Sequence, residues 1–184
     1  IVRSAEGRPV MEFGSRRAQG ISAAVIGARA AYIAGCVATA CTLTDQLYGV
    51  PAAGTMAHSW VQMFDTEYEA FKFYMETYPN NAILLVDTYN TLKSGIPNAI
   101  RVFKEYLAKG GKLDNYGIRL DSGDLSYLTK KARAMLDEAG LQDAKIVASN
   151  SLDEHLIKEL LRQGAKIDAF GVGERLITSQ TSPV

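Results

Sequence analysis

Residues 116–138, YGIRLDSGDLSYLTKKARAMLDE, contain the pattern that decides the fold. Residues 116–120 form a short run rich in β-favouring side chains and predict a strand. The polar residues 121–124 predict a loop, and residues 125–138 repeat apolar side chains at helical spacing up to Gly140. A strand, a polar loop and a helix in this order make one unit of an α/β protein.

The same unit repeats along the chain. Further strands are predicted at residues 82–86, 145–148 and 167–170, and further helices at about 96–108 and 152–162. The N-terminal third is more helical, with helices predicted at 21–34 and 66–77, and the recurring Tyr68, Phe71, Tyr74 and Met75 are assigned to the core. Strands in series, each followed by polar residues, indicate the α/β class, as a parallel barrel or an open sheet.

Composition narrows the class of protein. The 184 residues are 47% hydrophobic and contain no linker-like stretch, which fits one globular domain. Lys plus Arg and Asp plus Glu are both 20, so no nucleic-acid partner is indicated. Cys36 and Cys41 have no further cysteine to complete a zinc site or a disulfide framework, so we expect reduced thiols and a cytoplasmic protein. No run reaches the length of a membrane span, and the start without methionine suggests a portion of a longer protein.

The loops after parallel strands converge on one edge, so their polar residues are read together. Carboxylates suit Mg²⁺, hydroxyls and helix-start amides suit phosphate, and a guanidinium suits a phosphate or a pyridine ring. The set therefore indicates a magnesium-chelated phosphate ester as substrate. It comprises Asp87, Thr88, Arg119, Asp121, Ser122, Asp124, Ser149, Asn150 and the amides of Gly171, Gly173 and Glu174.

One histidine stands out beside this set. His58 directly follows the turn Gly54-Thr55-Met56-Ala57, where a helix could begin. An imidazole there can act as a base, a nucleophile or a temporary phosphate carrier, or it can simply cap or pack. His155 lies among charged residues and is expected to be exposed to solvent.

The other motifs each have a structural alternative. Residues 121–124 could only cap the following helix, and residues 12–17 could be a solvated basic turn. Gly171-Val172-Gly173 lacks the dinucleotide-binding fingerprint, because position 176 is leucine and not glycine.

Six ordered segments, spread over nearly the whole chain, resemble those of the nicotinate phosphoribosyltransferases. They are EFGSRRA (12–18), GTMAHSW (54–60), DTYNT (87–91), GIRLDSGD (117–124), SN (149–150) and FGVGERL (170–176). The resemblance implies transfer of phosphoribose from phosphoribosyl pyrophosphate to nicotinate in NAD salvage, giving nicotinate mononucleotide and pyrophosphate, with ATP hydrolysis coupled to turnover. It also implies an irregular TIM-like parallel α/β barrel of the type II phosphoribosyltransferases. Residues 1–184 would form part of that barrel domain, without the parent's N-terminal domain and C-terminal remainder.

The resemblance also implies roles for individual residues. His58 matches the histidine phosphorylated by ATP, and Phe13 and Arg119 match the pair that sandwiches the pyridine ring. Asp87 and Asp121 match carboxylates on the ribose or metal side and are the candidates for holding Mg²⁺. The catalytic set is thus His58, Asp121 and Arg119, and the substrate-binding set is Phe13, Arg16, Arg17, Asp87, Thr88, Ser122, Ser149, Asn150, Gly171, Gly173 and Glu174.

Some alternatives stay open. The family implies a homodimer, and the chain alone is expected to be inactive. In residues 42–46, where relatives generally carry a small polar loop, this sequence has Asp45, and in related nicotinamide enzymes a nearby aspartate favours the neutral amide. A nicotinamide or quinolinate phosphoribosyltransferase, or a non-catalytic binding protein with a barrel fold, therefore remains an alternative.

Overall fold

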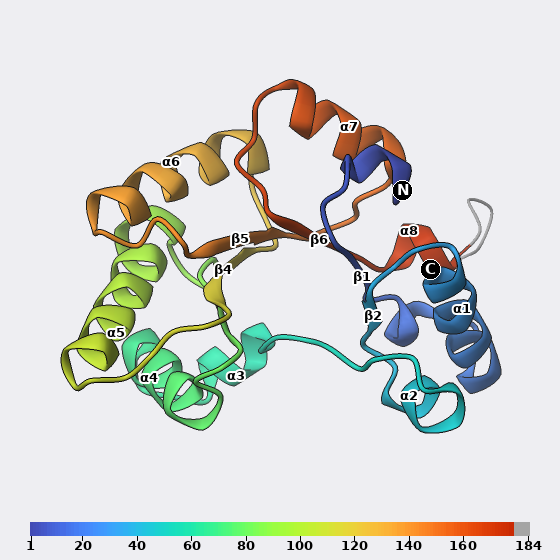
Figure 1. Ribbon diagram of the computed structural model, residues 1–184, viewed down its shortest axis with the longest axis horizontal. Coiled ribbons are helices and arrows are strands. Elements are labelled where there is room, and N and C mark those ends of the chain that lie inside the picture. The colour runs from blue at the N-terminus through green and yellow to red at the C-terminus, as the bar shows by residue number, and fades with distance from the viewer. Residues whose placement is uncertain (179–184) are drawn as a thin grey trace. The chain divides into compact units, whose positions relative to one another are not determined.

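The computed structural model describes residues 1–178, so the last six residues of the predicted 1–184 domain lie outside the described part. The chain divides into two compact units. Unit 1 consists of Ile1–Gly54, Ser149–Gly164 and the segment from Asp168 onward, and unit 2 consists of Thr55–Ala148 and Ala165–Ile167. Both units contain parallel strands and helices (Figure 1), which confirms the α/β class. That residues 1–184 form a single domain stays a prediction.

Unit 2 contains a parallel sheet with its strands in the order β3, β4 and β5. The strands are Ala82–Leu85, Tyr116–Leu120 and Lys145–Ala148. All four residues of β3 are buried, as expected for a parallel strand covered on both faces. Leu85 pairs with Arg119, and Arg119 pairs with Val147, so the C-terminal ends of the three strands meet at one edge.

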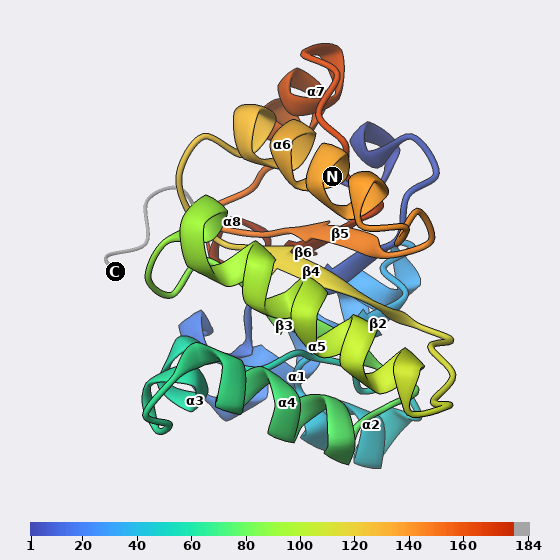
Figure 2. The same cartoon turned by 90° about the vertical axis from the view of Figure 1, so that its left-hand side faces the viewer.

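Four helices complete unit 2: α3 (His58–Gln62), α4 (Glu67–Thr77), α5 (Ile96–Ala108) and α6 (Leu125–Glu138). Helix α5 packs against both α4 and α6, and Figure 2 shows α5 along the sheet. Local sequence sets the helix starts, because Thr66 and Glu69 form a capping box for α4 and Asp124 caps α6 by accepting from the Tyr127 N–H.

A π-helical turn, Thr91–Gly95, joins the loop after β3 to α5. Gly95 approaches β3 so closely that a Cβ on this residue would lie 1.8 Å from the Val86 carbonyl oxygen. The Ser94 hydroxyl donates a hydrogen bond of 2.6 Å to the buried carboxylate of Glu67. These two contacts fix the segment that leads away from Val86.

In unit 1, β1 (Val10–Glu12) pairs in parallel with both β2 (Ala38–Thr39) and β6 (Ala169–Val172). The helices of this unit are α1 (Ile21–Ile33), α2 (Thr42–Tyr48), α7 (Glu154–Arg162) and α8 (Glu174–Ile177), with 3₁₀ turns η1 (Arg3–Ala5) and η2 (Ser15–Arg17). One side of α1 is buried, whereas Ile21, Ile26 and Ile33 are exposed.

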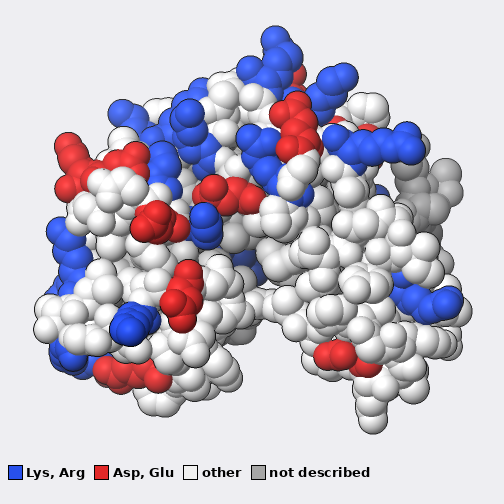
Figure 3. Space-filling model, in the orientation of Figure 1, with Lys and Arg blue, Asp and Glu red and all other residues white. Residues whose placement is uncertain are grey.

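Charged side chains of both signs are interspersed on the face shown in Figure 3, in keeping with a formal net charge of zero. Around α1 and α2 this face is mostly uncharged. Within residues 1–178, no helix combines the length and the apolar character needed to cross a membrane. Cys36 and Cys41 are free and buried among the described residues.

Most predicted element bounds are confirmed. The strands at 116–120 and 145–148 and the helices at 96–108 and 125–138 have the predicted ends, and the elements at 82–86, 21–34 and 66–77 agree within one residue. Phe71 and Met75 are buried as predicted. Tyr68 and Tyr74 are only half-buried, because their rings lie at the edge of the core, and the Tyr68 hydroxyl donates to Glu105 at 2.5 Å.

Three elements differ from the prediction. The last strand runs over Ala169–Val172 and not over 167–170, because its pairing with β1 continues from Phe170 to Val172. Helix α7 begins at Glu154 and not at 152, because the Asp153 side chain caps it by accepting two backbone N–H bonds. Residues 42–46 belong to helix α2 and do not form a loop.

Candidate active site

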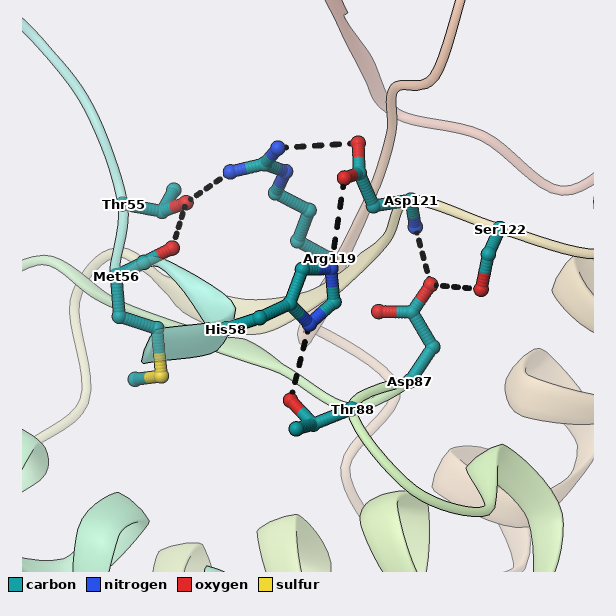
Figure 4. Close-up of polar contacts among 8 residues, drawn as sticks. All are labelled: Thr55, Met56, His58, Asp87, Thr88, Arg119, Asp121 and Ser122. Atoms are coloured by element: carbon teal, nitrogen blue, oxygen red, sulfur yellow. Dashed lines mark hydrogen bonds and ion pairs between the residues drawn. The ribbon is translucent and has the colours of Figure 1, made fainter. Parts of the chain in front are cut away.

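Six of the predicted site residues come together at the C-terminal edge of the unit 2 sheet. Asp87 and Thr88 follow β3, Arg119 lies in β4, Asp121 and Ser122 follow β4, and His58 begins α3 (Figure 4). The convergence expected for loops after parallel strands is therefore observed within this unit.

Arg119 is held at two edges of its guanidinium. Its Nη1 donates to the Thr55 hydroxyl oxygen at 2.8 Å, and its Nη2 donates to Asp121 Oδ1 at 3.1 Å. The side chain is only 15% exposed. Two contacts on different nitrogens fix the plane of the group, and a fixed planar cation can stack on an aromatic ring or pair with a carboxylate.

His58 is held at both ring nitrogens. Its Nε2 lies 3.5 Å from Asp121 Oδ2, and its Nδ1 lies 3.1 Å from the Thr88 hydroxyl oxygen. Which of His58 Nδ1 and the Thr88 hydroxyl donates depends on which ring nitrogen carries the proton. The side chain is 40% exposed and α3 has no side-chain cap, so neither the packing nor the capping alternative describes this histidine.

Asp87 organises the loop after β4. Its Oδ2 accepts the Asp121 backbone N–H at 2.7 Å and the Ser122 hydroxyl at 2.6 Å. Its Oδ1 is buried without a hydrogen-bond partner among the described residues. A buried acceptor left unpaired is unfavourable by about 1–3 kcal/mol, so this atom fits a ligand that brings a hydroxyl group or a cation.

Asp87 and Asp121, the two residues predicted to hold Mg²⁺, both lie in this cluster. Across residues 1–178, no three His, Cys, Asp or Glu side chains gather into a group that could hold a metal ion. Mg²⁺ characteristically uses one or two carboxylates together with water and substrate phosphates. The two aspartates fit that pattern, and they do not form a complete protein cage. Asp124 takes no part, because it caps α6, as the structural alternative for residues 121–124 proposed.

Unit 1 brings together a second group of predicted residues. The Phe13 N–H donates to the Val172 carbonyl oxygen at 2.7 Å, which places Phe13 directly after β1 and beside β6. A Cβ on Gly171 would lie 2.5 Å from the Phe13 ring and 3.4 Å from the Ser149 Cβ. Only glycine leaves room for the ring at this point of the strand.

The remaining predicted residues of unit 1 flank Phe13. Arg16 and Arg17 are exposed in the 3₁₀ turn after it, and Arg17 Nε lies 3.6 Å from Glu174 Oε2 at the start of α8. A Cβ added to the neighbouring Gly173 would lie 2.9 Å from the Phe13 carbonyl oxygen. Gly171 is inside β6, so of the three proposed phosphate-binding amides only those of Gly173 and Glu174 follow the strand.

Asn150 and Asp45 were also singled out by sequence. Asn150 follows β5 with φ of 91°, a left-handed conformation that is uncommon outside glycine and concentrates at functional loops. Asp45 lies in the first turn of α2, and its Oδ2 accepts the Ala52 N–H at 3.3 Å. Its carboxylate therefore stabilises the end of its own helix and loop.

Two residues were missed by the sequence analysis. Glu12, at the end of β1, is fully buried and accepts from the Gly14 N–H and from the Thr39 hydroxyl. Thr55 holds Arg119. The only available signal was that each stands inside a quoted motif, with Glu12 as a lone charge in an apolar strand. His155, on α7, has a side chain that is 87% exposed to solvent, as expected.

Comparison with known proteins matches residues 9–182 to the model of the nicotinate phosphoribosyltransferase (NAPRTase) family. The nicotinate phosphoribosyltransferase of Bacillus subtilis (strain 168) is 54% identical over 173 residues, which are 94% of this chain and 34% of that protein. The chain thus spans about a third of the length of this relative.

Two crystal structures are similar to the whole fold. Nicotinate-nucleotide pyrophosphorylase from Pyrococcus furiosus matches with a TM-score of 0.80 and 30% identity, over 96% of this chain and 44% of that one. Human nicotinic acid phosphoribosyltransferase matches with a TM-score of 0.76 and 26% identity, over 94% and 45%. These likenesses confirm the predicted fold class, a parallel α/β fold that forms part of a barrel. The chain belongs to the nicotinate phosphoribosyltransferase family.

Proposed function

We propose that the full-length protein containing this chain transfers phosphoribose from phosphoribosyl pyrophosphate to nicotinate, giving nicotinate mononucleotide and pyrophosphate. Family membership supports the proposal. The observation that carries it is the fixed guanidinium of Arg119, which lies beside the Asp121–His58 pair at the end of β4. A planar cation suits an anionic aromatic acid better than a neutral one.

The proposed reaction depends on positioning the two substrates and stabilising the charge of the leaving group more than on proton transfer. The lone pair of the pyridine nitrogen forms the new bond to ribose C1, and the bond from C1 to the pyrophosphate oxygen breaks with its electron pair leaving on pyrophosphate. No proton moves at the nitrogen in this step. Arg119 would orient the ring, and the free Oδ1 of Asp87 would accept a ribose hydroxyl or face the metal side.

We propose Mg²⁺ as the metal, with Asp87 and Asp121 as its protein contacts. When bound, it would neutralise charge on the pyrophosphate leaving group. Thr88, Ser122, Ser149 and Asn150 would contact substrate oxygens, and Arg16, Arg17, Gly173 and Glu174 would form the phosphate side, as the family resemblance implies. Phe13, with its ring over Gly171, would supply an aromatic face for the base.

His58 is proposed to carry the phosphoryl group that couples ATP hydrolysis to turnover. A ring nitrogen would attack the γ-phosphorus of ATP, the bond to the ADP oxygen would break, and water would later release phosphate from the imidazole. The exposure of His58 and its contacts to Asp121 and Thr88 support this role. The negative charge added to the ring would lie next to Asp121, so phosphorylation would change the electrostatics of the cluster.

The test uses the full-length protein with phosphoribosyl pyrophosphate and Mg²⁺, offered nicotinate, nicotinamide or quinolinate separately, with and without ATP. Nicotinate mononucleotide formed faster with ATP is the expected result. If nicotinamide or quinolinate gives the product instead, that base replaces nicotinate as the proposed substrate. If no base gives a product, a non-catalytic binding protein is favoured.

A variant pair tests the histidine. His58→Ala should abolish the stimulation by ATP while leaving basal transfer, and His155→Ala, the matched control on α7, should change neither. Equal loss of basal and ATP-stimulated transfer in His58→Ala would contradict the phosphoryl role. Acid-labile phosphate retained by the wild type but absent from His58→Ala would support it independently of product formation.

We also propose that the full-length protein is a homodimer, as the family resemblance implies, and that it is cytoplasmic, as its free cysteines favour. Light scattering on the purified protein and fractionation of the source cells check these two points.

A further inference from the structure

The contact between Thr55 and Arg119 joins residues 64 positions apart in the sequence. Thr55 is half-buried and stands before His58, and its hydroxyl oxygen accepts from Arg119 Nη1 at 2.8 Å. The same hydroxyl donates to the Met56 carbonyl oxygen at 3.3 Å (Figure 4). This donation turns a lone pair of the oxygen toward the guanidinium, so Thr55 acts as an oriented acceptor.

We propose that Thr55 is the positioning residue that sets the plane of Arg119 for the pyridine ring. This inference rests on the proposed function. Asp121 accepts from Nη2 at 3.1 Å, and removing the Thr55 hydroxyl would take away the hydrogen bond at Nη1 and loosen the plane of the guanidinium about the Nη2 contact. The hydrogen bond at Nη1 defines the orientation of the guanidinium plane. A tilt of this plane would reduce its contact with a pyridine ring stacked on it.

A neutral anchor also preserves the charge of Arg119. The single carboxylate of Asp121 is shared between Arg119 Nη2, at 3.1 Å, and His58 Nε2, at 3.5 Å. A second carboxylate at position 55 would neutralise the guanidinium further and weaken its attraction for an anionic base. Thr55 therefore orients the Arg119 guanidinium without adding a negative charge that would compete with the nicotinate carboxylate for it.

The first test compares Thr55→Val, which keeps the shape and removes the hydroxyl, with Thr55→Ser, which keeps the hydroxyl. In the full-length enzyme, Thr55→Val should raise the KM for nicotinate about 10-fold, which corresponds to about 1.4 kcal/mol. The kcat and the KM for phosphoribosyl pyrophosphate should change less than about twofold, and Thr55→Ser should restore the KM for nicotinate. Thr77→Val is the matched control, because the Thr77 hydroxyl is exposed and donates to the Phe73 carbonyl oxygen of its own helix.

The outcomes separate the two proposals. Three results would overturn the positioning role: an unchanged KM for nicotinate in Thr55→Val, an equal rise in the KM for nicotinate and for phosphoribosyl pyrophosphate, or no rescue by Thr55→Ser. In each case, formation of nicotinate mononucleotide by the wild type would still support the proposed function. A wild type that makes no nicotinate mononucleotide overturns both.

Two further measurements guard against a folding effect. Thr55→Ala replaces Thr55→Val if the valine variant does not fold, with the same expected KM change. Thr55→Asp should lower the preference for nicotinate over nicotinamide relative to the wild type, and an unchanged preference would contradict the charge argument.

Discussion

Replacing Glu12 by glutamine should weaken the loop that carries Phe13. The Glu12 side chain is fully buried, and its two oxygens are used separately. Oε1 accepts the Gly14 N–H, and Oε2 accepts the Thr39 hydroxyl at 2.5 Å. The carboxylate thereby ties the loop after β1 to the loop after β2.

The size of the expected destabilisation follows from the number of hydrogen-bond acceptors that each side chain offers. Glutamine offers one oxygen, so it can serve Gly14 or Thr39 but not both. The Thr39 oxygen also accepts the Cys41 N–H at 2.9 Å, so a rotated Thr39 hydroxyl would lose its own acceptor. Losing one hydrogen bond to a charged group corresponds to about 1.5–3 kcal/mol. Removing a buried charge relieves desolvation and opposes this loss, but both oxygens of Glu12 are already paired, so we expect the loss to dominate.

Hydrogen exchange provides the assay, because the Gly14 amide reports directly on the contact. In Glu12→Gln, the peptide covering residues 12–18 should exchange about 10 to 150 times faster, the factor that corresponds to about 1.5–3 kcal/mol. A peptide from α6 should be unchanged, and Glu138→Gln, at an exposed position of α6, is the control variant. Equal or stronger protection of residues 12–18 in Glu12→Gln would refute the reasoning, because it would mean that desolvation of the carboxylate outweighs its hydrogen bonds.

Three further predictions concern close packing. Gly171→Ala should displace the Phe13 ring, since the new Cβ would lie 2.5 Å from it, and should raise the KM for the base more than it lowers kcat in steady-state kinetics. Gly95→Ala should lower the free energy of unfolding in urea by at least about 3 kcal/mol, because the clash is with the Val86 backbone and no side chain can move aside; a smaller change would contradict it. Burial raises the pKa of the Cys36 thiol, so iodoacetamide at pH 8 should modify it at least about tenfold more slowly in the native protein than in urea, and equal rates would show that the site is open.

The fold was predictable where signals are local. Asp124 and Gly140 lie next to the two ends of α6 in the sequence, and this helix has the predicted bounds. The last strand was placed two residues early, because its end is set by pairing with β1, more than 150 positions away in the sequence. Helix α2 was missed because its capping position is Cys41, which carries no helix-start signal.

The candidate site also has parts that the sequence could predict and parts that it could not. The meeting of Asp87, Arg119 and Asp121 follows from the geometry of parallel strands and could be predicted from their loops alone. The contacts of Thr55 and Glu12 could not, since a threonine or a glutamate in a motif does not show which distant group it will bind. The parts of the predicted site in unit 1, among them Arg16 and Asn150, keep their assigned roles as predictions.

The π-helical turn Thr91–Gly95 limits how this segment can change in length. A π-turn closes its backbone bonds over one residue more than an α-helix, so deleting one residue would let α5 extend as an ordinary helix. Every side chain on one side of the deletion would then rotate by about 100° relative to the other side, which would part Ser94 from Glu67. A deletion that the helix tolerates would thus still remove the Ser94–Glu67 hydrogen bond, so the number of residues in this segment matters as much as their identity.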